Sequence, residues 1–425
     1  MPEYFHSVVL EEDKCCGCTN CIKRCPTEAI RVRDGKAHII TERCIDCGEC
    51  IRVCPHHAKK ARSDSIEEIE NFKYKIAIPA PALFGQFNNL DDIDIVLNGL
   101  LKLGFDSVYE VSRGAELVSQ ATRQLIRENK LKHPIISSAC PAVVRLIKQR
   151  FPDLCENVMP MKAPMEVSAM LAKKYAMEET GLPMEDIGAF FITPCPAKVT
   201  EINRPMDVNK RSYCDGAIAI SKIYPKLTSA MDKLTSIEPL ANSGVIGVGW
   251  ATSGGESAAM LGDRYLAADG IENVIRVLEE LEDERIRNVD FVELNACTGG
   301  CVGGVLTVEN PYVAQARIHT LRKYLPVSQN HLKDGVPDKM MWDKPLEYDE
   351  NVLSLDKDIN RAMEMMEQIE KIEASLPGLD CGSCGAPSCH AMAEDIVKGS
   401  AKETECIFKL REQIQQVYRD LMQMM

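Results

Sequence analysis

The chain lacks a long apolar segment, a surplus of basic residues and a signal-like start. No run reaches the ~18 apolar residues that a membrane-spanning helix requires, and the first six residues lack the basic-then-apolar pattern of a secretory signal. The 50 Lys and Arg are outnumbered by 63 Asp and Glu, and the net charge of −13 repels phosphate backbones and anionic lipid surfaces. The sequence therefore predicts a cytoplasmic protein that binds neither nucleic acid nor a membrane.

What the chain has in quantity is cysteine. Its 425 residues are 45% hydrophobic, enough for a sizeable core, and include 19 cysteines, although a reducing cytosol does not sustain a disulfide framework. Nine lie between Cys15 and Cys54, none between 55 and 139, six between 140 and 301, and four between Cys381 and Cys406. This uneven distribution indicates three metal-binding blocks.

The first block is an internal repeat in which a Cys-x2-Cys-x2-Cys-x3-Cys-Pro pattern occurs twice, about thirty residues apart. Three thiolates in one tight loop supply most of the cage for a [4Fe–4S] cubane, and in two-cluster ferredoxins the fourth Cys of each run binds the other cluster. One cluster is therefore predicted at Cys15, Cys18, Cys21 and Cys54, and the second at Cys44, Cys47, Cys50 and Cys25. Zinc, the alternative for thiolate ligands, fits two such runs poorly. Two neighbouring clusters form a path for single electrons.

Between residues 74 and 325, short apolar runs alternate with longer amphipathic stretches, which predicts an α/β domain with largely parallel sheets. Strands are expected at 74–78, 134–137, 188–193, 216–220 and 245–248. Helices are expected at 91–103, 115–129, 163–177 and 256–281. The stretch 326–350 is rich in Pro, Lys and Asp and is expected to be a linker, and a helix is expected near 351–374.

Three segments of this domain carry the remaining chemistry: Ser137-Ser-Ala-Cys140-Pro141, Thr193-Pro-Cys195-Pro-Ala-Lys198-Val-Thr-Glu201 and Glu293-Leu-Asn-Ala-Cys297-Thr-Gly-Gly-Cys301-Val-Gly-Gly304. A lone Cys-Pro is more often a buried packing thiol. Two segments directly follow predicted strands, however, and active sites in α/β sheets gather at strand ends, so the four thiolates indicate one metal centre. The glycines would let a bulky inorganic group approach the backbone. Lys198 could donate to an anionic ligand on the metal and Glu201 could orient Lys198 or move protons, unless the two form a solvated surface pair.

These segments resemble the three signature loops of the [FeFe] hydrogenases. The first cysteine block, ahead of them, resembles the N-terminal electron-transfer domain of that family. The resemblance spans roughly residues 10 to 325. It implies reversible reduction of two protons to H2 at an H-cluster, a [4Fe–4S] cubane joined to a two-iron subsite with CO, cyanide and azadithiolate. It also implies that Cys140, Cys195, Cys297 and Cys301 hold the cubane, that Cys301 bridges to the two-iron subsite, and that Lys198 hydrogen-bonds a cyanide. Residues 78–82 resemble a family loop beside the dithiolate.

The sequence departs from the efficient members of this family along the proton path. Those members carry two adjacent cysteines in the first loop, and Ala139 stands where the first of them relays protons. Thr193 and Asn295 stand where methionines are usual, and Met165 where a glutamine often faces a CO ligand. No acidic residue occurs at 117–127, where efficient members continue the path. Since proton transfer is worth ~10²–10⁴ in rate, slow turnover is expected, and the pattern resembles the sensory group of the family.

The last block places Cys381, Cys384 and Cys389 in a Gly-rich loop and Cys406 one helix away. Zinc is an alternative on spacing alone, but the run resembles a small [4Fe–4S] domain of anaerobic redox proteins, which sensory hydrogenases carry after the catalytic domain. Beyond it, apolar residues spaced 3, 4, 3, 4, 3 from Ile407 to Met424 form a heptad seam. A homodimer through this helix is one interpretation, and an amphipathic helix packed on its own domain is the other. Cys16, Cys155 and Cys214 fit no ligand set, and the last two are expected to be packing thiols.

The predicted organisation is α/β in the centre and α+β overall. It comprises a small ferredoxin-like domain (1–65), a two-lobed α/β hydrogenase domain (72–325), a linker (326–350), a helical iron–sulfur domain (351–406) and a terminal helix (407–425). Three functions stay open: a slow [FeFe] hydrogenase that senses H2 or redox state, a non-catalytic iron–sulfur carrier or assembly protein without the two-iron subsite, and a metabolic hydrogenase with another proton route. The expected partners are H2 and protons, maturation proteins for the two-iron subsite, and a redox protein or a signalling protein such as a kinase or phosphatase.

Overall fold

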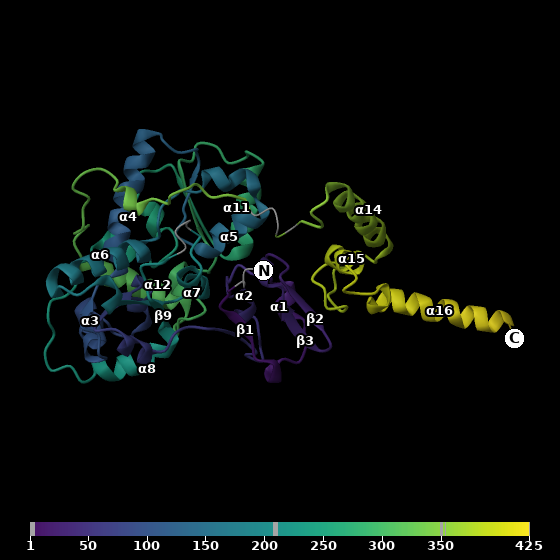
Figure 1. The fold of residues 1–425 in the computed structure, drawn as a ribbon, viewed down its shortest axis with the longest axis horizontal. Helices are drawn as coiled ribbons and strands as arrows, with labels where there is room; N and C mark the ends of the chain where they lie inside the picture. Colours follow the sequence, from purple (N-terminus) through teal and green to yellow (C-terminus); the bar gives the residue numbers. More distant parts are fainter. Residues whose placement is uncertain (1–4, 207–210, 349–351, 353, 425) are drawn as a thin grey trace.

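The protein consists of three bodies in a row (Figure 1). The computed structural model describes residues 5–206, 211–348, 352 and 354–424. A large α/β domain lies at one end, the small N-terminal domain lies in the middle, and the C-terminal helices lie at the other end. The small domain therefore separates the other two bodies, although it comes first in the sequence.

Two parallel sheets form the centre of the large domain. The first has the order β6-β5-β8-β9, and the second has the order β10-β11-β7. Their bounds are β5 Tyr74–Pro79, β6 Ser107–Val108, β7 Ile135–Ile136, β8 Ile187–Thr193, β9 Gly216–Ala219, β10 Tyr265–Asp269 and β11 Phe291–Asn295. All seven residues of β8 are buried, as expected for a parallel strand with helices on both faces. The predicted two-lobed α/β fold is confirmed.

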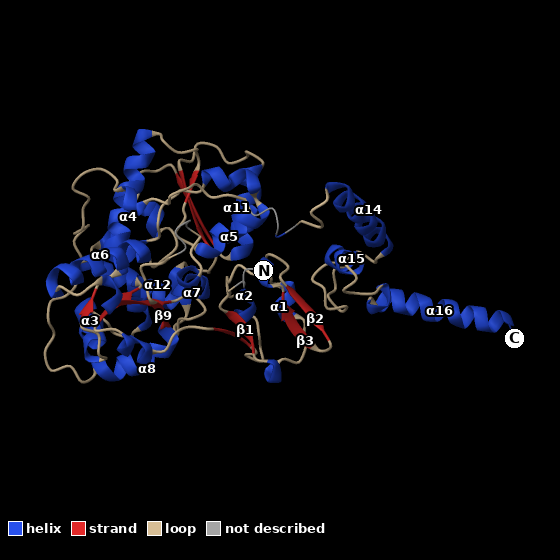
Figure 2. Cartoon of the chain, viewed as in Figure 1, coloured by secondary structure: helices blue, strands red, loops and turns tan. Residues whose placement is uncertain are grey.

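The helices of this domain surround the two sheets (Figure 2). They are α3 Ile93–Lys102, α4 Val111–Glu128, α5 Pro141–Arg150, α6 Pro164–Thr180, α7 Pro196–Asn203, α8 Ile220–Met231, α9 Val245–Gly249, α10 Gly255–Ala258, α11 Ile271–Glu282 and α12 Pro311–Leu321. The helices predicted at 91–103, 115–129 and 163–177 are confirmed as α3, α4 and α6, and four of the five predicted strands are confirmed as β5, β7, β8 and β9.

The strand predicted at 245–248 is wrong, because these residues form the short helix α9. A short apolar run does not by itself distinguish a strand from a buried helix. Here the packing decides: a Cβ on Gly247 would lie 2.2 Å from the carbonyl oxygen of Ser112 in α4, so the glycine lets the two helices touch backbone to backbone.

The single long helix predicted at 256–281 is also wrong. The segment contains α10, the strand β10 and α11, and Gly270 makes the turn between β10 and α11 with a φ of +80°. The sequence prediction missed the neighbouring strand β11 as well. Together, β10 and β11 build the second sheet, so both omissions concern the same lobe.

The small domain is built from two antiparallel pairs, β1 Val8–Leu10 with β4 Lys59–Ala61 and β2 Ile30–Arg33 with β3 Lys36–Ile39, and from the one-turn helices α1 Asn20–Lys23 and α2 Glu49–Arg52. Asp46 joins it to the large domain. This carboxylate is 1% exposed and accepts hydrogen bonds from the amides of Ser7 and Val8 and from the hydroxyl of Thr200 in α7, at 2.9 to 3.0 Å. Such charge-assisted bonds in a buried place fix the two domains relative to each other.

The predicted linker is irregular, but it follows the surface of the large domain as a strap. The Glu116 carboxylate accepts hydrogen bonds from the amides of Gln329 and Asn330, and the side chain of Met340 is 2% exposed. Residues 349 and 350 of the predicted linker, and 351 and 353 of the helix predicted after it, lie outside the described residues. The described helix there, α14, spans Ile359–Ser375.

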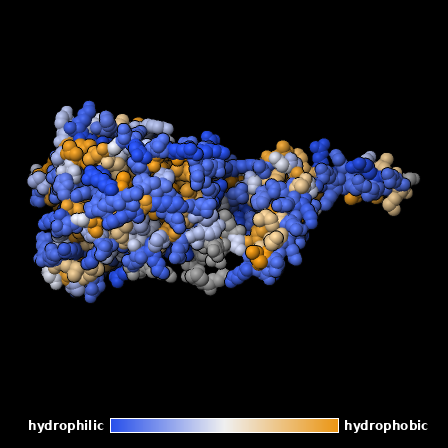
Figure 3. All heavy atoms as spheres, turned by 90° about the horizontal axis from the view of Figure 1, so that it is seen from above, coloured by the Kyte–Doolittle hydropathy of each residue, from blue (hydrophilic) through white to orange (hydrophobic). Residues whose placement is uncertain are grey.

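The C-terminal body contains α14, α15 (Cys389–Val397) and α16 (Ile407–Met424). The last helix projects away from the rest (Figures 1 and 3), and it has no buried residue among those described. The apolar seam is exposed, with Ile414 at 61% and Val417 at 58%. The alternative of a helix packed on its own domain therefore does not hold in this structure. None of the described helices is long and apolar enough to span a bilayer.

Candidate metal centre

The four cysteines of the large domain come from the carboxyl ends of three parallel strands. Cys140 follows β7, Cys195 follows β8, and Cys297 and Cys301 follow β11. Because β8 belongs to one sheet and β7 and β11 to the other, the cysteines meet where the two lobes face each other. Parallel strands end at the same edge of a sheet, which brings these loops together.

The Cys-Pro pairs have a local structural cause. Cys140 and Cys195 are the N-cap residues of α5 and α7, and the proline after each occupies the first turn of its helix. Proline is favoured there because its missing N–H would have no helical partner. Each helix thus directs its positive dipole end toward its own cysteine, which favours a thiolate.

The four cysteines line one cavity of about 80 Å³. Ala139, Met165, Lys198 and Asn295 line the same cavity, and so do Ala80 and Pro81 of the segment that follows β5. By comparison, the cysteine pocket of the small domain encloses about 20 Å³ and that of the C-terminal body about 10 Å³. The central cavity is therefore several times larger than these two cysteine-lined pockets.

The thiols in this cavity need a cationic partner to ionise. Burial raises the pKa of Cys195 to about 11 and that of Cys301 to about 12, and it raises the pKa of Cys297 well above the usual value. Neighbouring cysteines raise these pKa values further, whereas the charges of Lys198 and Arg52 and the backbone amides of Ala197 and Lys198 lower them. A set of four thiols in an apolar site fits an iron–sulfur cluster, whose iron ions displace the protons and neutralise the thiolates.

Lys198 lies in the first turn of α7 and is 9% exposed. Its ammonium group lines the cavity and donates a hydrogen bond to the carbonyl oxygen of Ala139 at 2.8 Å. Glu201, expected beside it, lies one turn further on and lines a neighbouring cavity together with Glu166. The Glu201 carboxylate accepts from the Arg145 guanidinium at 3.0 Å and from the amide of Met206 at 2.9 Å.

The glycines around Cys301 are required by the fold itself. A Cβ on Gly300 would lie 2.4 Å from the amide nitrogen of Ser253, and one on Gly304 would lie 2.2 Å from the carbonyl oxygen of Pro194. Besides the predicted approach of an inorganic group, these glycines have a packing role. They let the Cys301 loop touch the neighbouring chain segments directly.

Two buried carboxyl groups of this cavity were not found from the sequence. Glu256 and Glu293 line it together with the cysteines. Burial raises the pKa of both groups, and the charge of Glu293 raises the pKa of Glu256 further. The Ser137 hydroxyl hydrogen-bonds the Glu256 carboxyl at 2.7 Å and accepts from the amide of Ala139 at 3.1 Å. The sequence offers one indication of these groups: Glu293 is a charged residue inside the otherwise apolar strand Phe291–Asn295. No comparable indication marks Glu256.

Two positions that depart from the family have defined contacts. The Thr193 hydroxyl accepts from the amide of Cys195 at 3.2 Å, so it holds the ligand loop. The Asn295 side-chain amide donates to the Glu293 carboxylate at 2.8 Å. Thr193 and Asn295 thus hold Cys195 and Glu293 by hydrogen bonds, which an apolar methionine at either position could not donate or accept in this way.

The structure also brings together the predicted ligand sets of the small domain. One pocket is lined by Cys15, Cys18, Cys21 and Cys54, the set that takes its fourth member from the other repeat. Cys25 lies close enough to Cys44, Cys47 and Cys50 that its charge adds to burial in raising the pKa of all three. Both arrangements are crossed, as in two-cluster ferredoxins.

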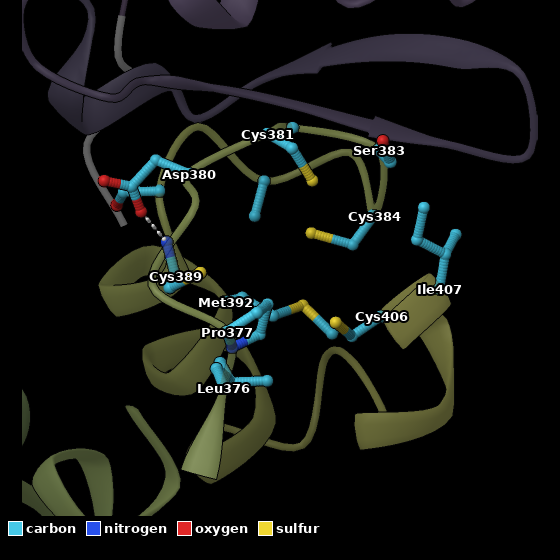
Figure 4. A pocket seen from close by; sticks show the side chains of 13 residues that line it. Leu376, Pro377, Asp380, Cys381, Ser383, Cys384, Cys389, Met392, Cys406 and Ile407 are labelled. Carbon is cyan, nitrogen blue, oxygen red and sulfur yellow. Dashed lines mark hydrogen bonds between the residues drawn. The ribbon is translucent and has the colours of Figure 1, made fainter. Parts of the chain in front are cut away.

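The last four cysteines line a pocket in the C-terminal body (Figure 4). The labelled side chains of Cys381, Cys384 and Cys406 point into one space, and Cys389 lies at its border. His390 is turned toward α14, where its ring nitrogen Nδ1 lies 2.7 Å from the Glu373 carboxylate. The remaining thiols differ: Cys155 and Cys214 are buried in apolar cores, as expected, and Cys16 is exposed.

Comparisons with known proteins agree with this geometry. The family described as "Iron only hydrogenase large subunit, C-terminal domain" matches residues 73–263 and 252–305, a "4Fe-4S dicluster domain" matches 7–55, and an Fe-S cluster family matches 376–408. Iron hydrogenase 1 of Clostridium pasteurianum is 25% identical over 306 residues, which cover 58% of this chain and 52% of that protein. The chain thus spans about half the length of the curated relatives it matches first.

Two further similarities are informative. The cytosolic Fe-S cluster assembly factor NAR1 of Scheffersomyces stipitis is 26% identical over 163 residues, 36% of this chain and 30% of that protein. A solved variant of the [FeFe]-hydrogenase HydA1 from Chlamydomonas reinhardtii superimposes with a TM-score of 0.51 at 18% identity, covering 65% of this chain and 94% of that one, which supports the fold. Since the iron-only hydrogenase family matches more than half of the residues, behind a dicluster domain, the chain belongs to the [FeFe] hydrogenase-like proteins.

Proposed function

We propose that this protein is a slow [FeFe] hydrogenase that interconverts protons and H2 and serves as a sensor of H2 or of redox state. The observation that carries the proposal is the cavity of about 80 Å³ in which four cysteines, Lys198 and two buried glutamates meet. This cavity is several times larger than the pockets of the first ferredoxin set and of the terminal set, which supports a group beyond a cubane at this place.

The residues of the cavity fit an H-cluster. Cys140, Cys195, Cys297 and Cys301 would hold the cubane, with Cys301 as the bridge to the two-iron subsite. When bound, that subsite supplies the redox chemistry of H2. The chain supplies the surroundings: Lys198 offers its ammonium to anionic ligands, and the apolar side chains of Pro81 and Met165 exclude water.

The proposed slow rate rests on position 139. Its methyl group can neither accept nor donate a proton, so a proton between cavity and protein must pass elsewhere. The Glu256 carboxyl, joined to the Ala139 amide through the Ser137 hydroxyl, can hold one. Because its pKa is raised by burial, this group stays protonated where an ordinary carboxyl is ionised. Glu256 thus offers protons a route that bypasses residue 139, and a fast turnover by this route would instead indicate a metabolic hydrogenase.

A second candidate function is a non-catalytic iron–sulfur carrier or assembly protein. The similarity to an Fe-S cluster assembly factor over 163 residues favours it. Such a protein would keep the four thiols and need no two-iron subsite. The buried ammonium of Lys198 in the cavity favours the hydrogenase instead, because a positive charge placed beside the metal suits anionic ligands there.

The proposed partners follow from this function. Maturation proteins would deliver the two-iron subsite, and a one-electron redox protein or a signalling protein such as a kinase or phosphatase would receive the output in the cytoplasm. The exposed seam of α16 is proposed to pair with a second copy of the chain, since a heptad repeat buries its apolar positions only against another helix.

The two-iron subsite can be tested directly by infrared spectroscopy. Protein matured with this subsite is expected to show CO and cyanide bands. Cys301→Ser should lose them, because the bridge is gone, whereas Cys155→Ser, at a buried thiol away from the cavity, should retain them. Absence of the bands from protein with full iron–sulfur content would favour the carrier or assembly function.

The Ala139→Cys variant is expected to raise H2 turnover by about 10²-fold, because a thiol beside the cavity can relay protons. Ser138→Cys is the matched control. Its side chain faces a neighbouring cavity and hydrogen-bonds the Met161 carbonyl, so turnover should stay unchanged. Equal turnover of Ala139→Cys and the unaltered protein, both fully loaded, would contradict the account of the slow rate.

The Glu256→Gln variant keeps the shape of the side chain but cannot titrate, and we expect turnover to fall by about 10²-fold. In the unaltered protein the raised pKa of Glu256 means that the proton is held above pH 4.5 and lost as pH rises through that pKa. Turnover should decline over the same range, and the variant should lose this dependence. Glu110→Gln, at a buried carboxyl with a raised pKa outside the cavity, should retain it.

Light scattering tests the pairing of α16. A dimer is expected at micromolar concentration, and Ile414→Glu should give a monomer, because it places a charge in the seam. Gln415→Glu, on the adjacent exposed position, should leave the dimer intact. If the unaltered chain is a monomer under these conditions, the helix does not act through a second copy.

A further inference from the structure

The C-terminal body is attached to the small domain by buried ion pairs that the sequence analysis did not predict. Arg31 and Arg33 of β2 both donate to the Asp395 carboxylate, at 2.7 and 2.6 Å. Arg43 pairs with Glu394, which precedes Asp395 on α15. All of these residues except Arg33 are 7% exposed or less. Partners held this way, away from water, define one relative position of the two bodies.

The same interface brings two cysteine pockets together. The amide of Val32 in β2 donates to the carbonyl oxygen of Gly385 at 2.8 Å, and the Arg33 guanidinium donates to the carbonyl oxygen of Cys384 at 2.7 Å. Val32 also lines the pocket of Cys15, Cys18, Cys21 and Cys54. A single residue of β2 thus borders one pocket and bonds to the ligand loop of the other.

The glycines of the terminal loop indicate how close this contact is. A Cβ on Gly385, whose φ is +80°, would lie 1.9 Å from the carbonyl oxygen of Val32. One on Gly382 would lie 2.8 Å from Lys23 and 3.4 Å from Ile22, the residue after the ligand Cys21. Figure 4 shows the purple strand of the small domain beside the loop that carries Cys381 and Cys384. The terminal ligand loop therefore needs glycine at 382 and 385 to pack this closely against the small domain.

We propose that Arg31, Arg33 and Arg43 dock the C-terminal body so that its cluster exchanges single electrons directly with the cluster of Cys15, Cys18, Cys21 and Cys54. The terminal pocket is then the outer end of one electron path through the protein.

The other side of the small domain supports this order. Gly48, within the second ligand run, faces Val305 and Pro196 of the large domain, and the Arg52 guanidinium donates to the carbonyl oxygen of Gly303 at 2.8 Å. Cys47 packs against the same apolar core as Cys140 and Cys195. The sequence of sites is thus the terminal pocket, the first ferredoxin pocket, the second ferredoxin pocket and the central cavity.

The step itself is an outer-sphere transfer. One electron leaves the reduced ferredoxin cluster, which is oxidised, and enters the oxidised terminal cluster, which is reduced. No bond forms or breaks, and no proton is required. Dithionite can supply the electron, so the inference does not depend on H2 chemistry and can be tested separately from the proposed function.

Electron paramagnetic resonance of the dithionite-reduced full chain, loaded with its iron–sulfur clusters, tests the docking. We expect the signal of the terminal cluster to be broadened by magnetic interaction with the first ferredoxin cluster. The matching extra broadening of the ferredoxin signal, beyond that caused by the second ferredoxin cluster, should disappear in Cys406→Ser, which cannot complete the terminal cluster. The double variant Arg31→Ala and Arg33→Ala should keep all iron and lose the broadening. Asp395→Ala, which removes the same pairs from the opposite side, should have the same effect.

Arg361→Ala is the matched control, because it removes an exposed arginine that pairs with Asp356 within the C-terminal body. It should leave the broadening unchanged. Absence of any interaction in the unaltered protein would overturn the proposal. So would broadening that persists in both docking variants with their clusters loaded, because the arginines would then not set the contact between the clusters.

Discussion

The structure depends on the meeting of thiols from distant parts of the chain. In the central cavity they come from three strands in two sheets, and in the small domain each set takes its fourth member from the other repeat. In the central cavity thiolates are unfavourable without a metal, since burial raises the pKa of Cys195 and Cys301. Iron binding therefore contributes to the free energy of folding, and the loops cannot be arranged independently of the sheets.

The position of the small domain follows from the same requirement. A path for electrons is useful only if its clusters stay close, and Asp46 on one side and the arginines of β2 on the other hold the neighbouring bodies in place. Both contacts use buried charges with several hydrogen-bond partners. Such groups stabilise little in total, because desolvation offsets much of their attraction, but they define one geometry.

The sequence predicted those features of the structure that depend on local residue patterns. Ligand spacing identified the cysteines, and apolar runs identified β5, β8 and β9. It failed where tertiary packing decides, as for α9, which is helical because Gly247 permits contact with Ser112. Buried charges are the other failure: Glu256 stands in an ordinary Gly-Gly-Glu-Ser stretch, and nothing in Arg31 or Arg43 distinguishes them from exposed arginines. Their roles appear only when both partners are placed.

The structure explains how position 139 can vary without harm to the metal centre. The backbone there is held from both sides: its carbonyl accepts from Lys198 and its amide donates to the Ser137 hydroxyl. Neither contact involves the side chain of residue 139. A cysteine or an alanine can therefore occupy the position while Cys140 keeps its place as the cap of α5. The hold on the ligand loop is thus separable from the side chain at position 139, so a substitution there leaves the cysteine pocket its shape.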